Sequence, residues 1–193
     1  MKENIRSIIQ ASIDCKIALA ENEELISIIK RSVEIITHAF RQGNKILFCG
    51  NGGSAADAQH LAAEFTGRFY KDRHALPAEA LHVNTSYMTA VANDYGFDEV
   101  YSRMINGIGK KGDVLVALST SGNSTNILNA IETAKEKEMI VIGFTGQSGG
   151  KMKNACNLLL NVPSSDTPRI QEIHILAGHI ICELTEAAYF SDK

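Results

Sequence analysis

Short apolar runs alternate with amphipathic stretches along most of this chain, and no other feature restricts its possible folds as strongly. The five apolar runs lie at residues 45–49, 79–83, 113–118, 139–144 and 157–162. Helical stretches separate them at about 54–69, 87–108, 124–137 and 149–155. Strands that alternate with helices predict βαβ units and a parallel sheet with helices on both faces. We therefore expect an α/β fold with five strands.

The first part of the chain predicts two helices ahead of the sheet. Residues 2–20 and 23–41 each repeat isoleucine or leucine at helical spacing, and Gly43 follows the second stretch as a stop signal. The 193 residues contain no linker and no low-complexity segment. We predict a single domain, in which residues 1–42 form the N-terminal helices and residues 43–193 form the α/β core and a C-terminal helix.

The C-terminal helix is predicted to be buried on more than one side. It begins near Pro168, a residue suited to a first helical turn, with Asp166 or Thr167 as the cap. It extends to about Phe190, and apolar residues cover most of its circumference. A single domain of this size seldom surrounds a long helix alone. We therefore expect the chain to self-associate through this helix and the N-terminal pair.

The composition excludes several classes of function. The formal net charge is −3, the basic residues are scattered, and aromatic residues make up only 6% of the chain, so no nucleic-acid surface is expected. No apolar stretch approaches the roughly 20 residues that a membrane span needs, and charged residues interrupt the N-terminal segment. The four cysteines lie far apart and indicate a reducing compartment. We expect a cytoplasmic protein with no nucleic-acid or membrane partner.

Two turns rich in glycine and serine each follow an apolar run and each open a helix. They occupy residues 50–54, Gly-Asn-Gly-Gly-Ser, and residues 119–124, Ser-Thr-Ser-Gly-Asn-Ser. The start of a helix presents free backbone N–H groups and the positive end of the helix dipole, which together suit a phosphate. On one parallel sheet both turns lie at the carboxyl edge of the strands. The pattern predicts a site for a phosphorylated small molecule.

The first turn allows three interpretations. Gly50, Gly52 and Ala55 match the spacing of a dinucleotide-binding fingerprint, but no acidic residue follows the second strand, which ends at Asn84. A tight turn without a ligand is the second interpretation. The third, which we favour, is that this turn binds a phosphate or sugar hydroxyls.

The second turn is more specific for phosphate. Its hydroxyl residues are Ser119, Thr120, Ser121 and Ser124, four at one helix start where a cap needs only one. No lysine occupies the position of a P-loop lysine, so a nucleoside triphosphate is not expected. We predict that this turn holds the phosphate.

Two predicted helices each carry a pair of polar residues that are candidates for metal binding or proton transfer. His60 and Glu64 are four residues apart and share a helix face, where they form either an ordinary surface pair or a group that binds zinc or transfers protons. Gln171 and His179 are eight residues apart and also share a face. For His179 alone, a hydrogen-bonded core histidine is an equally good interpretation.

Four segments of the chain carry long motifs. They are residues 50–64, 92–97, 119–124 and 167–179. Together they closely resemble the phosphoheptose isomerases of the sugar isomerase (SIS) fold family, and the resemblance extends over nearly the whole chain. It implies a three-layer α/β fold around a five-stranded parallel sheet, assembled as a homotetramer with active sites at subunit interfaces. It also implies an aldose–ketose isomerase that converts sedoheptulose 7-phosphate into D-glycero-D-manno-heptose 7-phosphate, toward nucleotide-activated heptose for bacterial surface polysaccharide.

The resemblance implies roles for individual residues. The phosphate would be held by Ser119, Thr120, Ser121 and Ser124. The sugar would contact Asn51, Gly52, Gly53, Ser54, Glu64, Asn93, Asp94 and Gln171. One zinc ion per subunit would be held by His60, Glu64, Gln171 and His179. Without the resemblance, Asn93 and Asp94 indicate a turn as well as they indicate sugar contacts.

An aldose–ketose isomerase needs one group that takes a proton from carbon and another that serves the oxygens. Glu64 is our candidate for the carbon proton, and His179 for the opposite side of the sugar or its oxygens. Zinc held by both residues would polarise the carbonyl group. Two alternatives stay open: a non-catalytic SIS protein that binds a partner, and an isomerase of another sugar phosphate.

Overall fold

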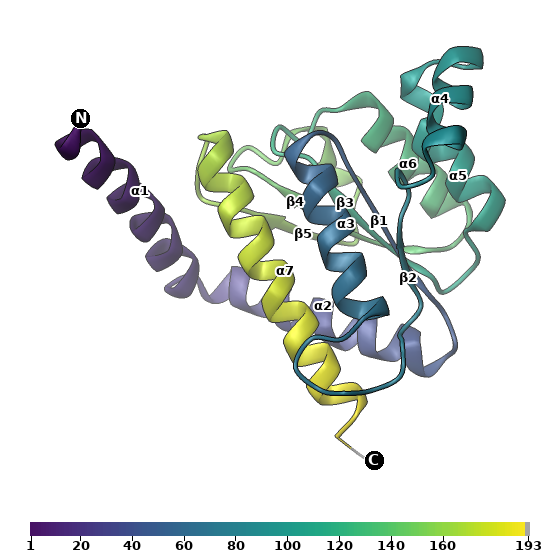
Figure 1. The fold of residues 1–193 in the computed structure, drawn as a ribbon, viewed down its shortest axis with the longest axis horizontal. Helices are drawn as coiled ribbons and strands as arrows, with labels where there is room; N and C mark the ends of the chain where they lie inside the picture. Colours follow the sequence, from purple (N-terminus) through teal and green to yellow (C-terminus); the bar gives the residue numbers. More distant parts are fainter. Residues whose placement is uncertain (192–193) are drawn as a thin grey trace.

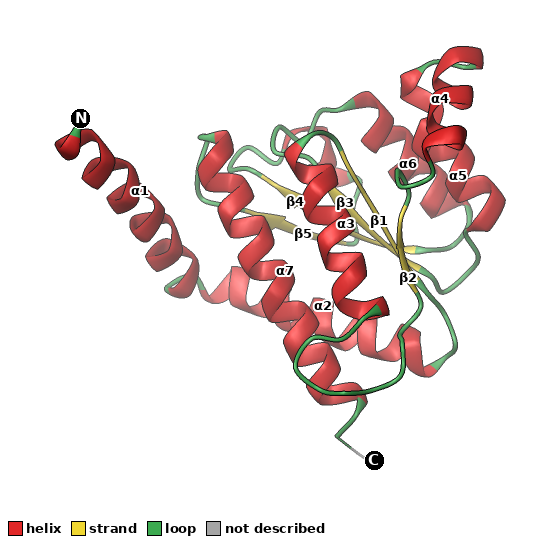
Figure 2. Ribbon diagram, in the orientation of Figure 1, coloured by secondary structure: helices red, strands yellow, loops and turns green. Residues whose placement is uncertain are grey.

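The computed structural model describes residues 1–191, in which five parallel strands form one sheet between helices (Figure 1, Figure 2). The strands are β1 (Ile46–Gly50), β2 (Ala78–Ala80), β3 (Val114–Leu118), β4 (Ile140–Thr145) and β5 (Leu158–Asn161). They lie in the order β2-β1-β3-β4-β5, and every neighbouring pair is parallel. The predicted α/β fold with five parallel strands is confirmed.

The helices cover both faces of this sheet. They are α1 (Lys2–Ala20), α2 (Glu23–Arg41), α3 (Gly53–Thr66), α4 (Thr85–Asp94), α5 (Val100–Ile108), α6 (Thr125–Glu136) and α7 (Thr167–Tyr189), with two short 3₁₀ helices, η1 (Phe97–Glu99) and η2 (Gly150–Asn154). Residues of α1, α2, α3 and α7 share one hydrophobic core with the sheet, and residues of α4, α5 and α6 share the other. The fold is therefore a three-layer sandwich.

Alternate residues of the central strands enter the two cores. Phe48 of β1 packs in the core of α2, α3 and α7, whereas its neighbours Leu47 and Cys49 pack in the core of α4, α5 and α6. All residues of β1 and β3 are buried. A strand that is buried on both faces has no polar alternation, which is why these strands appear in the sequence as continuous apolar runs.

Two predicted helices differ from the structure. The single helix expected at 87–108 is wrong, because α4 ends at Asp94 and Gly96 adopts a φ of +95°, outside the right-handed helical region. A short 3₁₀ turn then leads into α5. The helix expected at 149–155 is only a 3₁₀ helix. The predicted stop after the second helix is confirmed, since Gly43 follows α2 with a φ of +73°.

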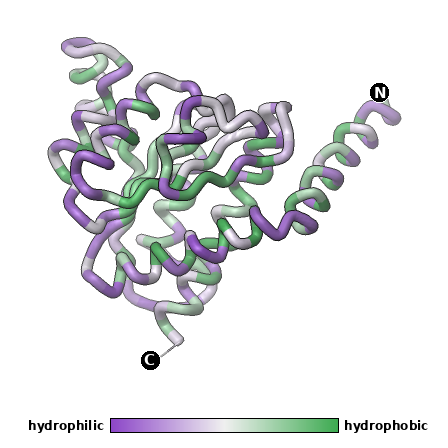
Figure 3. The backbone as a smooth tube through the Cα atoms, turned by 180° about the vertical axis from the view of Figure 1, so that it is seen from behind, coloured by the Kyte–Doolittle hydropathy of each residue, from purple (hydrophilic) through white to green (hydrophobic). Residues whose placement is uncertain are grey.

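The N-terminal helix α1 extends away from the sheet and its covering helices (Figure 1), and the view from behind shows the same arm (Figure 3). Its isoleucines are between 42% and 56% exposed: Ile5, Ile8, Ile9, Ile13 and Ile17. Where α1 meets α2 and α7, an open groove of about 550 Å³ is lined largely by apolar side chains, among them Ile26, Leu176 and Ile180. Within residues 1–191, no helix combines the length and the apolar character that crossing a membrane requires.

Candidate active site

The two glycine- and serine-rich turns lie next to each other at the carboxyl edge of the sheet. Gly50, the last residue of β1, is paired with Leu118, the last residue of β3, so the turns leave the sheet at the same level. The side chains of Asn51 and Asn126 exchange two hydrogen bonds, with N···O distances of 2.9 and 2.8 Å. Asn126 is buried in the first turn of α6, so this pair joins the turns from inside the protein.

The turn at residues 50–54 has little room for side chains. A Cβ atom on Gly50 would lie 2.5 Å from the backbone oxygen of Ser54, and Gly52 has a φ of +55°. The hydroxyl of the buried Tyr101 donates to the carbonyl of Gly50. Gly52 is the N-cap of α3 and brings no side chain to cap it. The first backbone N–H groups of α3 therefore face the turn without a capping side chain.

The turn at residues 119–124 brings two of the predicted hydroxyls together. Ser119 Oγ and Ser124 Oγ are 3.1 Å apart. Ser124 is the N-cap of α6, yet its side chain makes no capping bond to the helix. Gly122 has a φ of +66°, and a Cβ atom there would lie 2.3 Å from the backbone oxygen of Gly149, so this turn packs directly on the loop after β4. The hydroxyls and the uncapped helix start are the features that suit an anion.

A polar cavity of about 280 Å³ lies beside this second turn. Thr120 and Ser121 line one wall. The other walls come from the loops after β4 and β5 and include Gln147, Ser148, Ser164 and Ser165. The sequence interpretation missed these four residues. They could have been found from their positions, because both loops follow strands of the same parallel sheet and so meet at its carboxyl edge.

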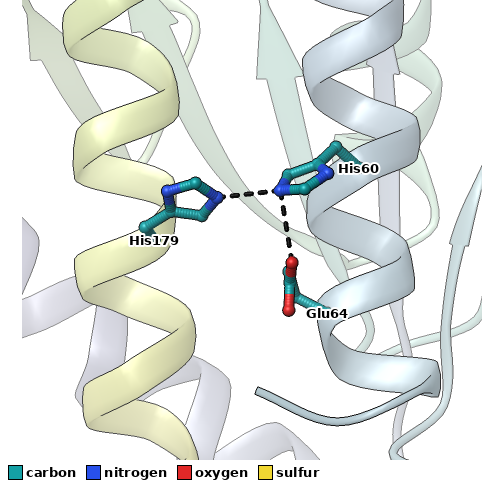
Figure 4. Close-up of side chains that lie close together, drawn as sticks. All are labelled: His60, Glu64 and His179. Atoms are coloured by element: carbon teal, nitrogen blue, oxygen red, sulfur yellow. Dashed lines mark hydrogen bonds and ion pairs between the residues drawn. The ribbon is translucent and has the colours of Figure 1, made fainter. Parts of the chain in front are cut away.

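His60, Glu64 and His179 form a cluster between α3 and α7 (Figure 4). The Nε2 atoms of His60 and His179 are 2.8 Å apart, and His60 Nε2 lies 3.2 Å from Glu64 Oε1. The helices come this close because α7 has glycine at position 178, where a Cβ atom would lie 2.5 Å from Leu61 of α3. The structure thus brings together three of the four predicted zinc ligands.

This cluster fits a metal ion. One oxygen and two nitrogen atoms lie within 4.8 Å of one another, and histidine and glutamate are common ligands of catalytic zinc. The side chain of His60 is 51% exposed and that of Glu64 is 22% exposed, so an ion and a substrate can reach them from solvent. Among residues 1–191, the second oxygen of Glu64 makes no hydrogen bond.

A second acidic group lies one helical turn before His60. Burial raises the pKa of Asp57, although the nearby His60 opposes the shift. Asp57 Oδ2 is buried and has no hydrogen-bond partner in the described part of the chain. The sequence interpretation missed Asp57, for which the three-residue spacing to His60 was the only signal. Asp57, near His60 on α3, therefore keeps its proton to a higher pH than a free aspartate.

The remaining predicted residues lie outside the cluster. The amide of Gln171 rests against the start of α3, since a Cβ atom on Gly53 would lie 2.6 Å from its Nε2 atom. Gln171 therefore lies beside the first turn, and its role as a zinc ligand stays a prediction. Asn93 and Asp94 are exposed at the end of α4, where Asn93 Nδ2 donates to Asp94 Oδ1 over 2.8 Å. Ser54 is buried, with 3% exposed.

The sequence and the fold are similar to those of known proteins. The sequence profile of the SIS domain family matches residues 15–146. The chain is 53% identical to the phosphoheptose isomerase of Rhodospirillum rubrum, over 99% of this chain and 100% of the relative. It is 50% identical to the phosphoheptose isomerase of Aneurinibacillus thermoaerophilus, over 100% of this chain and 98% of the relative. The structure of phosphoheptose isomerase from Neisseria gonorrhoeae matches with a TM-score of 0.89 at 43% identity, covering 96% of this chain and 98% of that chain.

Proposed function

Because the chain belongs to the SIS domain family and, within it, to the phosphoheptose isomerases, we propose how its own residues convert sedoheptulose 7-phosphate into D-glycero-D-manno-heptose 7-phosphate. The observation that carries the proposal is that α3 begins at the turn of residues 50–54, without a side-chain cap, and bears two members of the His–Glu–His cluster. The product would serve the synthesis of nucleotide-activated heptose for bacterial surface polysaccharide.

The turn at residues 119–124 would bind the phosphate. The hydroxyls of Ser119, Thr120, Ser121 and Ser124 and the uncapped N-terminus of α6 supply donors and a positive dipole end. The adjoining polar cavity of about 280 Å³ offers room beside them. This arrangement anchors one end of the substrate and needs no basic side chain.

The turn at residues 50–54 would bind the sugar through its backbone. The N–H groups near Gly52 and Gly53 are free of side-chain caps, and the amide of Gln171 lies against them. The side chain of Asn51 is engaged by Asn126, so Asn51 would contact the sugar through its backbone. We keep Ser54, Asn93 and Asp94 as proposed sugar contacts on the resemblance alone.

His60, Glu64 and His179 would hold one zinc ion per subunit, with Gln171 as the proposed fourth ligand. A bound zinc ion supplies Lewis-acid polarisation of a carbonyl oxygen. The support for this metal is the convergence of two imidazole nitrogens and one carboxylate oxygen. The chemistry of this donor set matches zinc better than magnesium or calcium, which prefer oxygen ligands.

Glu64 and His179 would move the protons. Glu64 takes the proton from C1 of the ketose while the oxygen on C2 gains a proton, which gives a 1,2-enediol. Glu64 then returns a proton to C2, the hydroxyl on C1 loses its proton, and the aldose forms. His179 would carry the proton between the two oxygens. The second oxygen of Glu64, which makes no hydrogen bond within residues 1–191, is available for this transfer.

We further propose a cytoplasmic homotetramer with active sites at subunit interfaces. The exposed isoleucines of α1 and the apolar groove shared by α1, α2 and α7 are surfaces that a second copy would cover. The four cysteines are free thiols, in keeping with a reducing compartment. In such an assembly, the turns and the cluster that build one site need not come from the same subunit.

A substrate screen on the purified protein tests this function. Seven-, six- and five-carbon ketose phosphates are offered separately, and aldose formation is followed together with the zinc content. We expect the seven-carbon substrate to be converted with the highest kcat/KM. A preference for a shorter sugar would support an isomerase of another sugar phosphate, and no conversion of any of them would support a partner-binding protein.

A further inference from the structure

One buried carboxylate fastens the segment that follows α3 to helix α7. Glu186 is only 2% exposed, and its Oε1 atom accepts hydrogen bonds from the backbone N–H of Phe69 (3.0 Å) and from Nε of Arg73 (2.9 Å). Its Oε2 atom accepts from the backbone N–H groups of Tyr70 and Lys71, both at 2.8 Å. Burial favours a neutral Glu186, but these hydrogen bonds outweigh it and lower the pKa, so the group stays a carboxylate.

Arg73, the ion-pair partner of Glu186, also caps the C-terminus of α3. Its side chain is 4% exposed. Nη2 donates to the carbonyl of Glu64 over 2.9 Å, and Nη1 donates to the carbonyls of Phe65 (2.6 Å) and Gly67 (3.0 Å). The carbonyls of Glu64 and Phe65 are among the last of the helix, which find no partner within it, and Gly67 is the C-cap. A cation at this end also suits the negative pole of the helix dipole.

The capping by Arg73 holds the helical turn that carries Glu64, a member of the His60–Glu64–His179 cluster. Glu64 lies in the last turn of α3, the part of a helix that frays most easily, and Arg73 holds its carbonyl. On the other side, the ring of Phe69 lies 5.9 Å from the imidazole of His179, and Glu186 holds the backbone N–H of Phe69. His179 and Glu186 are seven residues apart, about two turns, and share a face of α7.

We propose that Glu186 and Arg73 are positioning residues of the isomerase, which fix Glu64 of α3 against His179 of α7. The proposal rests on the proposed roles of Glu64 and His179. Both positioning side chains bond to backbone groups and to each other, so they act through the cluster and not on the sugar.

The substitution Glu186→Gln tests this role with almost no change in size. One of the two carboxylate oxygens becomes an NH₂ group, and the two N–H donors that faced that oxygen lose their acceptor. The buried Arg73 also loses its counter-charge. We expect the segment from Phe69 to Lys71 to become more mobile, and the C-terminal turn of α3 to become more mobile with it.

We would measure three properties of Glu186→Gln: kcat and KM for sedoheptulose 7-phosphate, the affinity for Co²⁺, and the absorption spectrum of the Co²⁺-loaded protein. We expect kcat to fall and Co²⁺ affinity to fall by about tenfold or more, as is typical when groups that orient metal ligands are changed. The visible Co²⁺ bands should change, while KM stays within about twofold because the phosphate turn is separate.

Asp113→Asn is the matched control. Asp113 is fully buried, accepts backbone hydrogen bonds from Lys45 and Lys110, and pairs with the ammonium group of Lys45. It precedes β3, at the amino edge of the sheet and so away from the two turns. We expect this variant to lose stability but to keep the kcat and the Co²⁺ affinity of the unmodified protein.

Arg73→Lys provides a second test if Glu186→Gln does not fold. Lysine keeps the positive charge beside Glu186 but cannot reach several carbonyls at once as the guanidinium does. We expect kcat and Co²⁺ affinity to fall in the same direction with KM little changed. Unaltered kcat and Co²⁺ binding in a folded variant would overturn the proposal, and so would an equal loss in Asp113→Asn.

Turnover and Co²⁺ binding of the unmodified protein, together with turnover of Glu64→Gln, distinguish failure of the positioning role from failure of the proposed function. If the unmodified protein isomerises the sugar but binds no Co²⁺, the proposed metal is wrong, and the split between kcat and KM in the two variants decides the positioning role. If Glu64→Gln retains full turnover, the catalytic assignment is wrong and the positioning role falls with it.

Discussion

Asn51 and Asn126 bind each other through both of their side-chain amides, over 2.9 and 2.8 Å, and so hold the two glycine- and serine-rich turns at a fixed spacing. In the proposed binding mode the phosphate lies at one turn and the sugar at the other, so this spacing decides whether both ends of the substrate are bound at once. Asn126→Ala should leave the amide of Asn51 without its partners and cost about 1–3 kcal/mol of stability. We expect KM to rise and kcat to fall, measured by steady-state kinetics alongside urea denaturation.

Asn129→Ala is the control on the same helix. Asn129 donates two longer hydrogen bonds, 3.2 Å to the carbonyl of Asp98 and 3.3 Å to Glu99. Its removal should change neither kinetic constant appreciably. Kinetic constants of Asn126→Ala equal to those of this control would contradict the spacing role.

The double substitution Ser119→Ala with Ser124→Ala tests the phosphate site. It removes two hydroxyls that lie 3.1 Å apart and leaves the backbone of the turn in place. Hydrogen bonds to a charged group are strong, so we expect KM to rise by about tenfold or more with a smaller effect on kcat. Ser102→Ala, at a buried serine of α5, should leave KM unchanged. A change confined to kcat would argue against phosphate binding here.

Gly178→Ala tests the contact between α3 and α7. The new Cβ atom would lie 2.5 Å from a side-chain carbon of Leu61, so either this buried side chain moves or the helices separate at the level of His179. Overpacking of this kind costs about 1–3 kcal/mol. We expect weaker metal binding and lower kcat, and partial recovery when Leu61→Ala is added. Failure of the second substitution to restore either property would show that helix spacing is not the cause.

His174 makes stability depend on pH. Burial lowers the pKa of His174 from an ordinary value of 6.5 to about 4, despite its contact with the carbonyl of Thr145. Between these values the unfolded chain binds a proton that the folded protein does not, so stability falls as the pH drops from 6.5 toward 4. We expect this residue to lower the free energy of unfolding by about 2 kcal/mol between pH 7 and pH 5.

The comparison with His174→Gln isolates this contribution. Urea denaturation of both proteins at the two pH values gives the difference. The variant should lose about 2 kcal/mol less than the unmodified protein on going to pH 5. Equal losses in the two proteins would place the pH dependence elsewhere.

The sequence predicted four strands well because parallel strands buried on both faces appear as continuous apolar runs, as in β1 and β3. The second strand, expected at 79–83, is only Ala78–Ala80. The sequence missed the break at Gly96, although the turn signal after Asp94 was visible, because apolar residues at helical spacing continue on both sides. The pairing of His60 with His179 also could not be derived from spacing within either helix alone. It depends on the close approach at Gly178.

Other parts of the site carry no local sequence signal. Asn126 is bonded to a residue 75 positions away, and Glu186 is bonded to backbone groups more than 110 positions away. Backbone donors are common to every residue type, so the sequence cannot mark Glu186 as their acceptor. The contacts of Glu186 arise only when α7 packs against the segment after α3, so they are visible only in the folded structure.

Hydrogen exchange at carbon tests whether Glu64 is the base that takes the proton from the sugar. Sedoheptulose 7-phosphate is incubated in D₂O with the unmodified protein and with Glu64→Gln, and deuterium at C1 of the ketose and C2 of the aldose is followed by NMR. The unmodified protein should form the aldose and incorporate deuterium. Glu64→Gln should fold and bind the substrate but exchange at least about 100-fold more slowly. Exchange by Glu64→Gln at nearly the rate of the unmodified protein would contradict the role of Glu64 as the base.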